Sequence, residues 1–322
     1  MDGLLVIDKP AGPTSHDVVA RVRRLLDEPR VGHTGTLDPA ATGVLPLVVG
    51  RATRLARFLS ASDKSYDATI RLGVATDTGD AEGSPVGPHA KGAWPSRDVL
   101  ERALDTFRGT HPQQPPAFSA KKIGGTRSYK LARARAAALL TPVAPVAPLA
   151  PAPVALAAPV APLAPAPVLV TAHAIELVSV ADDLVTIRLE CSAGFYVRAL
   201  AQELGERLGV GAHLATLRRT RSGGFGLSEA VELDAIEREP ALALRTLVPL
   251  SRMLSSLEAV TLTLDGVRRA LHGQDLGPAD TEKGVVPPDP FFVRLLDREG
   301  QLLGIAEPSQ VPGFLHPAVV LV

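Results

Sequence analysis

Asp38 is the residue of this chain whose surroundings best suit chemistry. It lies in GHTGTLDPAATGVLPL (residues 32–47) and is the only carboxylate between Arg30 and Arg57. Aspartate before proline is common in turns, so a turn residue is the ordinary interpretation of Asp38 taken alone. An acid isolated on a bent loop among glycines and threonines can also be a nucleophile that adds to a substrate and is released later. The loop is therefore the first candidate for a catalytic site.

This loop resembles the catalytic loop of the bacterial tRNA pseudouridine synthase B family, as does GLLVIDKPAGPTSHDVV (residues 3–19) before it. Further blocks follow in the family's order and spacing. They are DKSYDATIRLG (63–73), PPAFSAKKIGGTRSY (115–129), CSAGFYVRALAQELGERLG (191–209) and GAHLATLRRTRSG (211–223). Several ordered blocks are far more specific than one short motif.

The resemblance implies an enzyme that isomerises uridine to pseudouridine in the T arm of tRNA, at position 55. The N1–C1′ bond breaks, the base turns, and C5 joins C1′, without redox change, cofactor or metal. Asp38 matches the family's nucleophile, and attack at C6 of the base or at C1′ of the sugar both stay open. The base must leave the RNA stack, because stacking and pairing shield the atoms under attack.

Two residues near position 197 take substrate-binding roles by resemblance. Arg198 in GFYVRAL is the family's position for a cation beside the nucleophile, and Tyr196 is its neighbour in the pocket. A carboxylate that is shielded from water needs such a cation, because burial alone raises its pKa. From the pattern alone, a solvated arginine on a helix face is the more common interpretation of Arg198.

Three more residues match the family's uracil pocket. Tyr66 lies on the apolar face of a strand pattern, so core packing and function are equally open from the residues, whereas the family places this tyrosine against the uracil. Leu217 matches a leucine that lines the pocket, although an isolated leucine is usually a core residue. His33 matches a residue that fills the space left by the flipped uridine; without the resemblance it could be a turn residue.

Charge is balanced in total but not along the chain. There are 34 basic and 34 acidic residues, yet no acid occurs between Asp105 and Glu176, and none between Glu206 and Glu229. Basic residues in the first gap look like contacts to the RNA backbone, which set affinity and salt dependence rather than sequence choice. They include Lys121, Lys122, Arg127 and Lys130. A solvated basic surface helix is the alternative, and the length of the acid-free window favours RNA.

The remaining composition favours a cytoplasmic protein. Cys191 is the only cysteine, so an intrachain disulfide is excluded, and no CxxC or HExxH spacing suggests a zinc site. No apolar run reaches the length of a membrane span, and the charges near the N-terminus do not fit a signal peptide. We expect a monomer that binds tRNA and requires no metal, cofactor or membrane.

The elements that would position these residues mix strands and helices without a regular β-α-β order. Residues 4–10 and the alternating residues 66–72 indicate strands, Ser15 is suited to cap a helix over 16–28, and a helix is expected over 51–59. These patterns predict an α+β fold. The resemblance implies the pseudouridine synthase fold, with a mixed, mainly antiparallel central sheet and flanking helices.

We expect a catalytic domain over residues 1–250 and a small, mainly β module over 251–322. Within the first, residues 108–170 are expected to form a basic RNA-binding flap that includes a proline- and alanine-rich spacer at 141–168. The module is similar to RNA-binding modules of the PUA type. An unrelated stabilising β module is nearly as well supported by its strand patterns.

Other function classes stay open on the residues. A non-catalytic tRNA-folding chaperone would keep the RNA-binding surface but would not need Asp38. A pseudouridine synthase of the guide-RNA type is disfavoured by the absence of long basic tails. A phosphate-using enzyme is disfavoured because no GxxxxGK[ST] or GxGxxG segment occurs.

Part of the proline- and alanine-rich spacer should be removable without loss of stability or activity. APVAPLAPAPV occurs at 144–154 and, unchanged, at 158–168, and proline at this density excludes helix and sheet. Deleting residues 155–168 should leave the melting temperature, the tRNA affinity and the single-turnover rate unchanged, because halving a loop alters its closure free energy by only about 0.6 kcal/mol. A loss of rate or affinity above tenfold would show instead that the spacer positions the flap.

Overall fold

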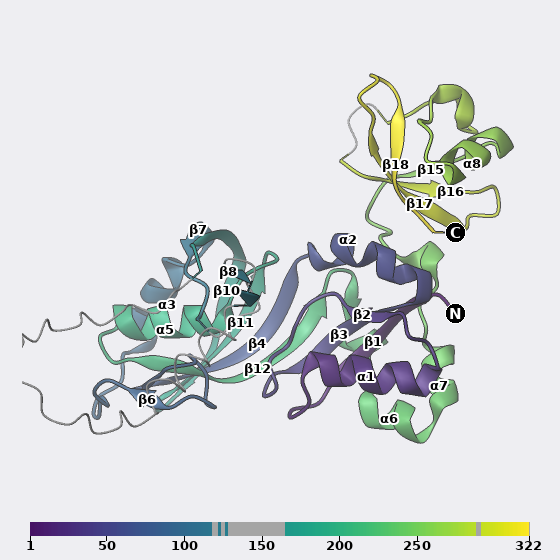
Figure 1. Cartoon of the computed structure of the whole chain (residues 1–322). Coiled ribbons are helices and arrows are strands. Elements are labelled where there is room, and N and C mark those ends of the chain that lie inside the picture. Colours follow the sequence, from purple (N-terminus) through teal and green to yellow (C-terminus); the bar gives the residue numbers. More distant parts are fainter. Residues whose placement is uncertain (118–121, 124–125, 128–164, 288–290, 322) are drawn as a thin grey trace, which may run out of the picture. The chain divides into compact units, whose positions relative to one another are not determined.

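The computed structural model describes residues 1–117, 122–123, 126–127, 165–287 and 291–321 (Figure 1). Residues 141–164 of the expected spacer, together with Lys121 and Lys130, lie outside the described residues. By their contacts the residues form two compact units. The first contains Met1–Tyr66 and Arg218–Val322, and the second contains Asp67–Leu217. A boundary between a catalytic domain and a C-terminal module near residue 250 stays our proposal.

The first unit is built on strands from both ends of the chain. They are β1 (Gly3–Lys9), β2 (Val31–His33), β3 (Thr42–Val49), β13 (Phe225–Gly226), β14 (Val231–Glu232) and the end of β12 (Ala212–Ser222). Strand β1 pairs antiparallel with β3 and parallel with β14, and β12 pairs parallel with β3. The helices are α1 (Ser15–Leu26), the 3₁₀ helix η1 (Gly50–Leu55), α2 (Ala56–Ser60), α6 (Leu233–Arg238) and α7 (Pro240–Arg245). The helix expected over 51–59 is thus a 3₁₀ segment followed by a short α-helix.

The start of α1 corrects one expectation. Thr14, not Ser15, caps the helix: its Oγ1 accepts the N–H of Asp17 at 3.1 Å, and the Asp17 carboxylate accepts the N–H of Thr14 at 2.8 Å. This reciprocal arrangement is a capping box. The hydroxyl of Ser15 cannot serve as the cap because it is fully buried and bonded to the backbone of Leu37.

The C-terminal part of the first unit is a small sheet with one longer helix, which confirms the expected small β module. Its strands pair in the order β15-β16-β17-β18. The elements are β15 (Ala259–Thr261), α8 (Leu264–Leu271), β16 (Val293–Leu296), β17 (Leu302–Pro308) and β18 (Leu315–Val320). Leu262 and Val293 belong to an apolar cluster within the module, whereas Ile305 and Leu321 pack with residues of β1 and β3.

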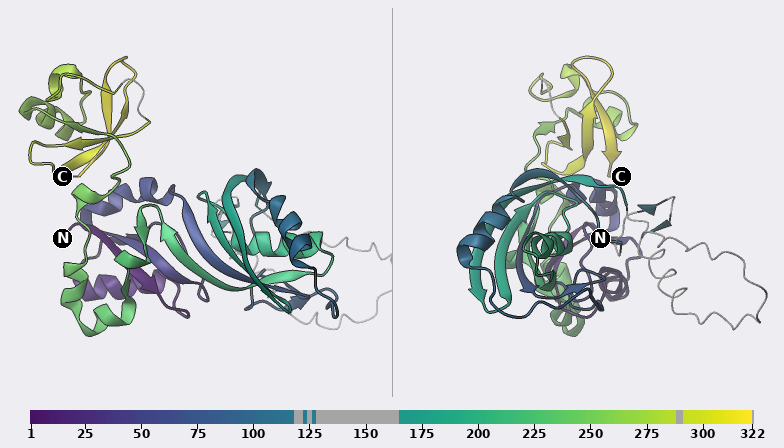
Figure 2. Two further views of the ribbon diagram at one scale, coloured as in Figure 1. Left: turned by 180° about the vertical axis from the view of Figure 1, so that it is seen from behind. Right: turned by 90° about the vertical axis from the view of Figure 1, so that its left-hand side faces the viewer.

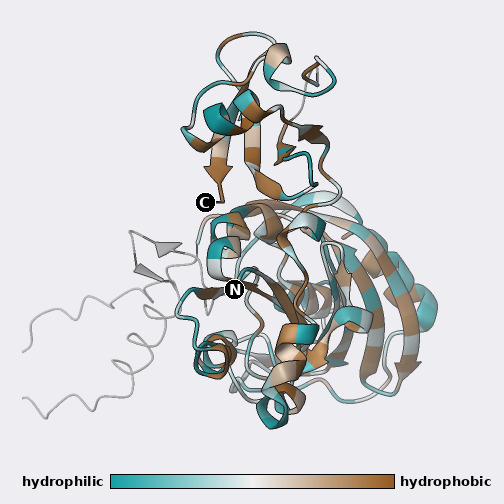
Figure 3. Cartoon of the chain, turned by 90° about the vertical axis from the view of Figure 1, so that its right-hand side faces the viewer, coloured by the Kyte–Doolittle hydropathy of each residue, from teal (hydrophilic) through white to brown (hydrophobic). Residues whose placement is uncertain are grey.

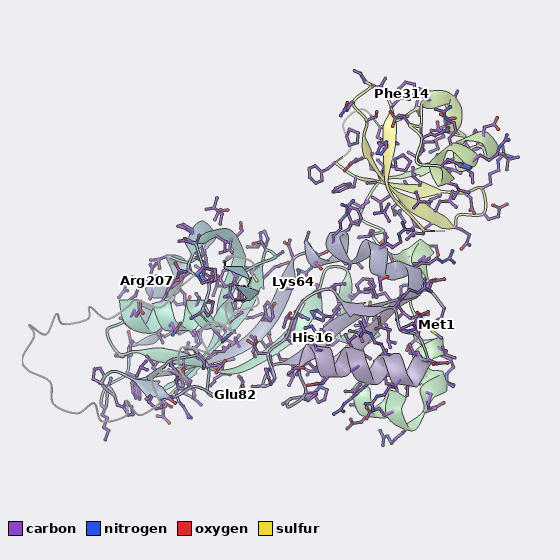
Figure 4. All side chains as sticks on the ribbon, in the orientation of Figure 1. Met1, His16, Lys64, Glu82, Arg207 and Phe314 are labelled. Carbon is purple, nitrogen blue, oxygen red and sulfur yellow. The ribbon has the colours of Figure 1, made fainter. Side chains whose placement is uncertain are left out.

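The second unit combines an antiparallel sheet with two helices (Figure 2). Its main strands are β4 (Lys64–Leu72), β7 (Gly109–Gln113), β10 (Val168–Ala181), β11 (Leu184–Cys191) and the start of β12. Short strand pairs are β5 (Ala75–Thr76) with β6 (Pro85–Val86) and β8 (Lys122–Ile123) with β9 (Thr126–Arg127). The helices are α3 (Arg97–Asp105) and α5 (Val197–Arg207). Arg207 of α5, labelled in Figure 4, stacks on the ring of Phe107 just after α3.

Strands β4 and β12 run from one unit into the other, and the hydrogen-bonded order is β14-β1-β3-β12-β4-β11-β10-β7. Burial alternates along β4, with Tyr66, Ala68, Ile70 and Leu72 buried, so the predicted strand is confirmed. Figure 3 shows apolar residues concentrated on the strands. A mixed, mainly antiparallel sheet with flanking helices and a small C-terminal sheet confirms the predicted α+β class.

The pairing of β3 with β12 predicts a sensitive position at Gly43. Its φ is +99°, and a Cβ there would lie 2.1 Å from the carbonyl oxygen of Arg219. Gly43→Ala should therefore lower the free energy of unfolding by about 3 kcal/mol or more, through clash and backbone strain together. Gly12→Ala is the matched control, because Gly12 has φ +107° with open space around it, and should lose only about 1–2 kcal/mol through strain. Equal losses on urea unfolding would contradict the close approach.

Candidate active site

Asp38 lies on the loop that joins β2 to β3 in the first unit. Its residue is half-buried, and its carbonyl oxygen accepts the N–H of Ala41 at 3.1 Å, which closes a turn around Pro39. The turn chemistry expected of an Asp-Pro pair is therefore present. It does not decide between a turn residue and a nucleophile, because the main chain makes the turn and the carboxylate is a separate group.

Ser15 fixes the residue that precedes Asp38. Its Oγ donates to the carbonyl oxygen of Leu37 at 2.9 Å and accepts the N–H of Leu37 at 2.8 Å. A single hydroxyl thus satisfies both backbone groups of one residue, and both Ser15 and Leu37 are buried. The polypeptide cannot rotate at Leu37 without breaking two buried hydrogen bonds.

Lys9 holds the other side of the loop. Its ammonium donates to the carbonyl oxygens of Pro10 at 2.8 Å, Pro39 at 3.0 Å and Ala41 at 2.7 Å. Lys9 has no exposed surface at all, although lysine is almost never fully buried in proteins. The carbonyl oxygens lie where the three N–H donors of the ammonium can reach them, so the charge is solvated by the loop itself.

Arg219 of β12 is the third anchor. Its Nε donates to the carbonyl oxygen of Val44 at 2.7 Å, one Nη donates to that of Gly35 at 3.0 Å, and the other reaches that of Thr36 at 3.5 Å. The residue is only 1% exposed. Lys9, Ser15 and Arg219 come from three separate parts of the sequence, and together they bind backbone groups on both sides of Asp38.

His33 and Tyr66 are the other predicted site residues of the first unit. His33 ends strand β2, so it is not a turn residue, and its ring packs edge-on against that of His16 with centroids 5.2 Å apart. His16 and Lys64 are labelled in Figure 4. Tyr66 is 8% exposed and lies in β4, which agrees with either role that its pattern left open.

Arg198 is the second residue of α5, in the second unit, and the interpretation as a solvated surface arginine is wrong. Only 7% of the residue is exposed. One Nη donates to the carbonyl oxygen of Thr78 at 2.9 Å and lies 3.5 Å from the Asp80 carboxylate. Tyr196, which is half-buried, immediately precedes the helix. Tyr196 and Arg198 thus both lie at the start of α5.

Asp80 is the acidic partner of Arg198, and the sequence patterns did not single it out. Its carboxylate accepts the hydroxyl of Thr78 at 2.6 Å and the N–H of Glu82 at 3.1 Å, which orients it toward Arg198. A usable signal was present, because Asp80 belongs to a cluster of acids at 77–82. Acids of a solvated loop are expected to be exposed, whereas the Asp80 side chain retains 15% of its accessible surface.

The remaining predicted residues are less defined. Leu217 of β12 is half-buried, so it is not an ordinary core leucine. Lys122 and Arg127 belong by their main chain to the short strands β8 and β9.

Among the described residues, no three His, Cys, Asp or Glu side chains gather to hold a metal ion. Within the same ranges no helix has the length and apolar character needed to cross a bilayer.

The six catalytic and pocket residues predicted from the sequence divide equally between the two units. The first unit contains His33, Asp38 and Tyr66, and the second contains Tyr196, Arg198 and Leu217. In the first unit, Lys9, Ser15 and Arg219 fix the main chain of the loop that carries the Asp38 carboxylate. In the second, the start of α5 holds the buried guanidinium of Arg198, two residues after Tyr196.

Two family models match the chain. That of the TruB family pseudouridylate synthase (N terminal domain) matches residues 23–144, and that of the tRNA pseudouridylate synthase B C-terminal domain matches residues 198–261. The tRNA pseudouridine synthase B of Solibacter usitatus (strain Ellin6076) is 39% identical over 326 residues, which span 100% of both chains. That of Aromatoleum aromaticum (strain DSM 19018 / LMG 30748 / EbN1) is 38% identical over 308 residues, covering 95% of this chain and 89% of the relative.

Solved structures support the fold. A structure of an H/ACA RNP bound to a substrate RNA containing 2′-deoxyuridine matches with a TM-score of 0.68 and 22% identity, covering 99% of this chain and 85% of that chain. A Cbf5-Nop10-Gar1 complex matches with a TM-score of 0.67 and 24% identity, with the same coverage. At this identity the likeness concerns the architecture alone.

The anchoring of the Asp38 loop predicts the effect of Lys9→Met. Methionine has a similar length but leaves the carbonyl oxygens of Pro39 and Ala41 without the ammonium, so the free energy of unfolding should fall by about 2–4 kcal/mol. The N–H groups of Gly12 and Ala41, which donate to the loop carbonyls, should exchange with solvent at least tenfold faster relative to those of α8. Lys283→Met, at an exposed lysine of the same unit, is the control. Unchanged exchange at Gly12 and Ala41 would remove Lys9 as an anchor.

Proposed function

The chain belongs to the TruB family of pseudouridylate synthases, and on this basis we propose that it isomerises uridine 55 in the T arm of tRNA. The observation that carries the proposal is the state of the Asp38 loop. The Asp38 carboxylate lies on a loop whose backbone groups are held by buried side chains on both sides of Asp38. Such rigidity is what a nucleophile needs and more than a turn requires.

Isomerisation of uridine to pseudouridine requires a nucleophile and a route for proton transfer. The carboxylate of Asp38 adds to the substrate, the N1–C1′ bond breaks, the uracil turns, and C5 bonds to C1′. C5 then loses its proton, N1 gains one, and the carboxylate is released, so that the product has the same atoms as uridine. The reaction has no net redox change, so the proposal requires no cofactor. Addition at C6 of the base and addition at C1′ of the sugar both fit a single carboxylate.

The other predicted residues receive roles within this proposal. Arg198 supplies the cation that keeps the nucleophile ionised, because a neighbouring positive charge favours the charged form of a carboxylate. Tyr66 stacks on the uracil and can take the proton from C5, while Tyr196 and Leu217 shape the pocket. His33 fills the gap that the flipped uridine leaves in the RNA.

The RNA is held by charge outside the pocket. We propose that Lys121, Lys122, Arg127 and Lys130 contact backbone phosphates of the T stem-loop, which gives affinity that falls with salt. On this view the protein acts as a monomer in the cytoplasm on free tRNA. The name shared by the relatives, tRNA pseudouridine synthase B, supports tRNA as the substrate class.

Asp38→Asn tests the proposal. Asparagine keeps the shape of the side chain but cannot act as an anionic nucleophile, so release of tritium from 5-labelled uridine in tRNA should stop while tRNA binding stays within threefold. Asp27→Asn is the control, because Asp27 is exposed and adopts a left-handed conformation, φ 47°, that asparagine also tolerates. Residual turnover within tenfold of the wild type would exclude Asp38 as the nucleophile.

A further inference from the structure

Gln113, the last residue of β7, is a buried polar residue outside the set that the family resemblance assigns. It is 1% exposed, and its main chain pairs with Val168 of β10. Its carboxamide Nε2 donates to the carbonyl oxygen of Tyr196 at 3.1 Å, and its Oε1 accepts the N–H of Tyr196 at 2.8 Å. The Gln113 carboxamide therefore forms hydrogen bonds with both the N–H and the C=O of Tyr196, and both residues belong to the second unit.

Tyr196 needs such a partner because of its place in the chain. It is the N-cap residue of α5, with extended backbone (φ −109°, ψ 107°) and no side-chain hydrogen bond at the cap. Its N–H is not used by the helix, whereas its carbonyl oxygen already accepts the N–H of Leu200 at 3.2 Å. Gln113 satisfies the first group and adds a second bond to the other, so the carboxamide sets the direction in which the chain enters α5.

The same bonds control Arg198, which comes two residues later. Its guanidinium is held at the far end by the carbonyl oxygen of Thr78 and the carboxylate of Asp80. If the Tyr196 peptide rotated, the first turn of α5 would rotate with it, and Arg198 would move away from Thr78 and Asp80. Displacement of a reacting or orienting group by about 1 Å can lower a rate by two orders of magnitude.

We propose that Gln113 is a positioning residue for the isomerisation: its carboxamide holds the main chain of Tyr196, and through it Arg198, in the orientation that the reaction needs. The inference rests on the proposed function, because it assigns Gln113 a role in that reaction. It differs from a general packing role in one respect. What the role requires is a hydrogen-bond donor and an acceptor on one planar group, whereas a packing role requires only the volume of the side chain.

Two substitutions separate these roles. Gln113→Met keeps the volume and loses both bonds. Gln113→Glu keeps the acceptor but loses the donor while the carboxyl is ionised. A protonated carboxyl restores the pair, because its O–H donates to the Tyr196 carbonyl oxygen and its C=O accepts the Tyr196 N–H. Burial raises the pKa of the introduced carboxyl, so protonation should occur at mildly acidic pH.

Single-turnover formation of pseudouridine in tRNA should be followed from pH 8 to pH 5.5 with the wild type and both variants. At pH 8 we expect both variants to react at least tenfold more slowly than the wild type, with tRNA dissociation constants within threefold. As pH falls, the rate of Gln113→Glu should rise relative to both other proteins. The wild type and Gln113→Met carry the same other ionisable groups, among them His111 on β7 and Glu203 on α5, so a pH response confined to Gln113→Glu is assigned to the introduced carboxyl.

Specific outcomes would overturn the inference. A Gln113→Met rate within twofold of the wild type would do so, as would a Gln113→Glu rate that keeps a constant ratio to the wild type at every pH. The second result decides the matter even if Gln113→Met fails to fold. Absence of pseudouridine with the wild-type protein would instead overturn the proposed function, and this inference with it.

Discussion

The structure depends on how the carbonyl groups of one loop are satisfied. Lys9 from β1, Ser15 from α1 and Arg219 from β12 bind the backbone on both sides of Asp38. Buried amines, hydroxyls and guanidinium groups are unfavourable unless their hydrogen bonds are made, and these side chains make them to the loop. Folding of the three surrounding segments and ordering of the loop are therefore one event. A carboxylate on such a loop meets a substrate without first losing conformational entropy.

The second unit repeats this solution with different residues. Ser15 donates to and accepts from the backbone of Leu37, next to the proposed nucleophile, and Gln113 does the same for Tyr196, two residues before the proposed cation. In each case a polar side chain from a distant segment replaces the neighbouring strand that a β-sheet would provide. In both places the main chain beside the proposed reactive or charged side chain is fixed by a polar side chain from elsewhere in the sequence. A fixed main chain suits the proposed binding of a base turned out of an RNA stack, because less of the binding site must be ordered after the RNA binds.

Local patterns account for what could be predicted from the sequence. The alternation at residues 66–72 specifies a strand with one buried face, and the ordered motifs point to Asp38 because its spacing to neighbouring glycines and prolines is local. Ser15 was a reasonable cap by its position, but Thr14 takes that role because the Ser15 hydroxyl has a partner more than twenty residues away. Nothing near Gln113 distinguishes it from Gln114, since its function arises only when β7 lies beside the start of α5. Long-range pairing of polar groups has no periodicity, so sequence patterns do not reveal it.

The proposal that this protein forms pseudouridine at one uridine of tRNA, with no added cofactor, can be tested on the reaction itself. Its most direct test is to incubate the purified protein with an unmodified tRNA transcript and to map pseudouridine by carbodiimide modification and primer extension. We expect a single stop that reports pseudouridine at position 55 in the T loop, reaches full conversion, and is absent from a transcript with cytidine at that position. No stop, or stops at uridines elsewhere in the tRNA with position 55 unchanged, would contradict it.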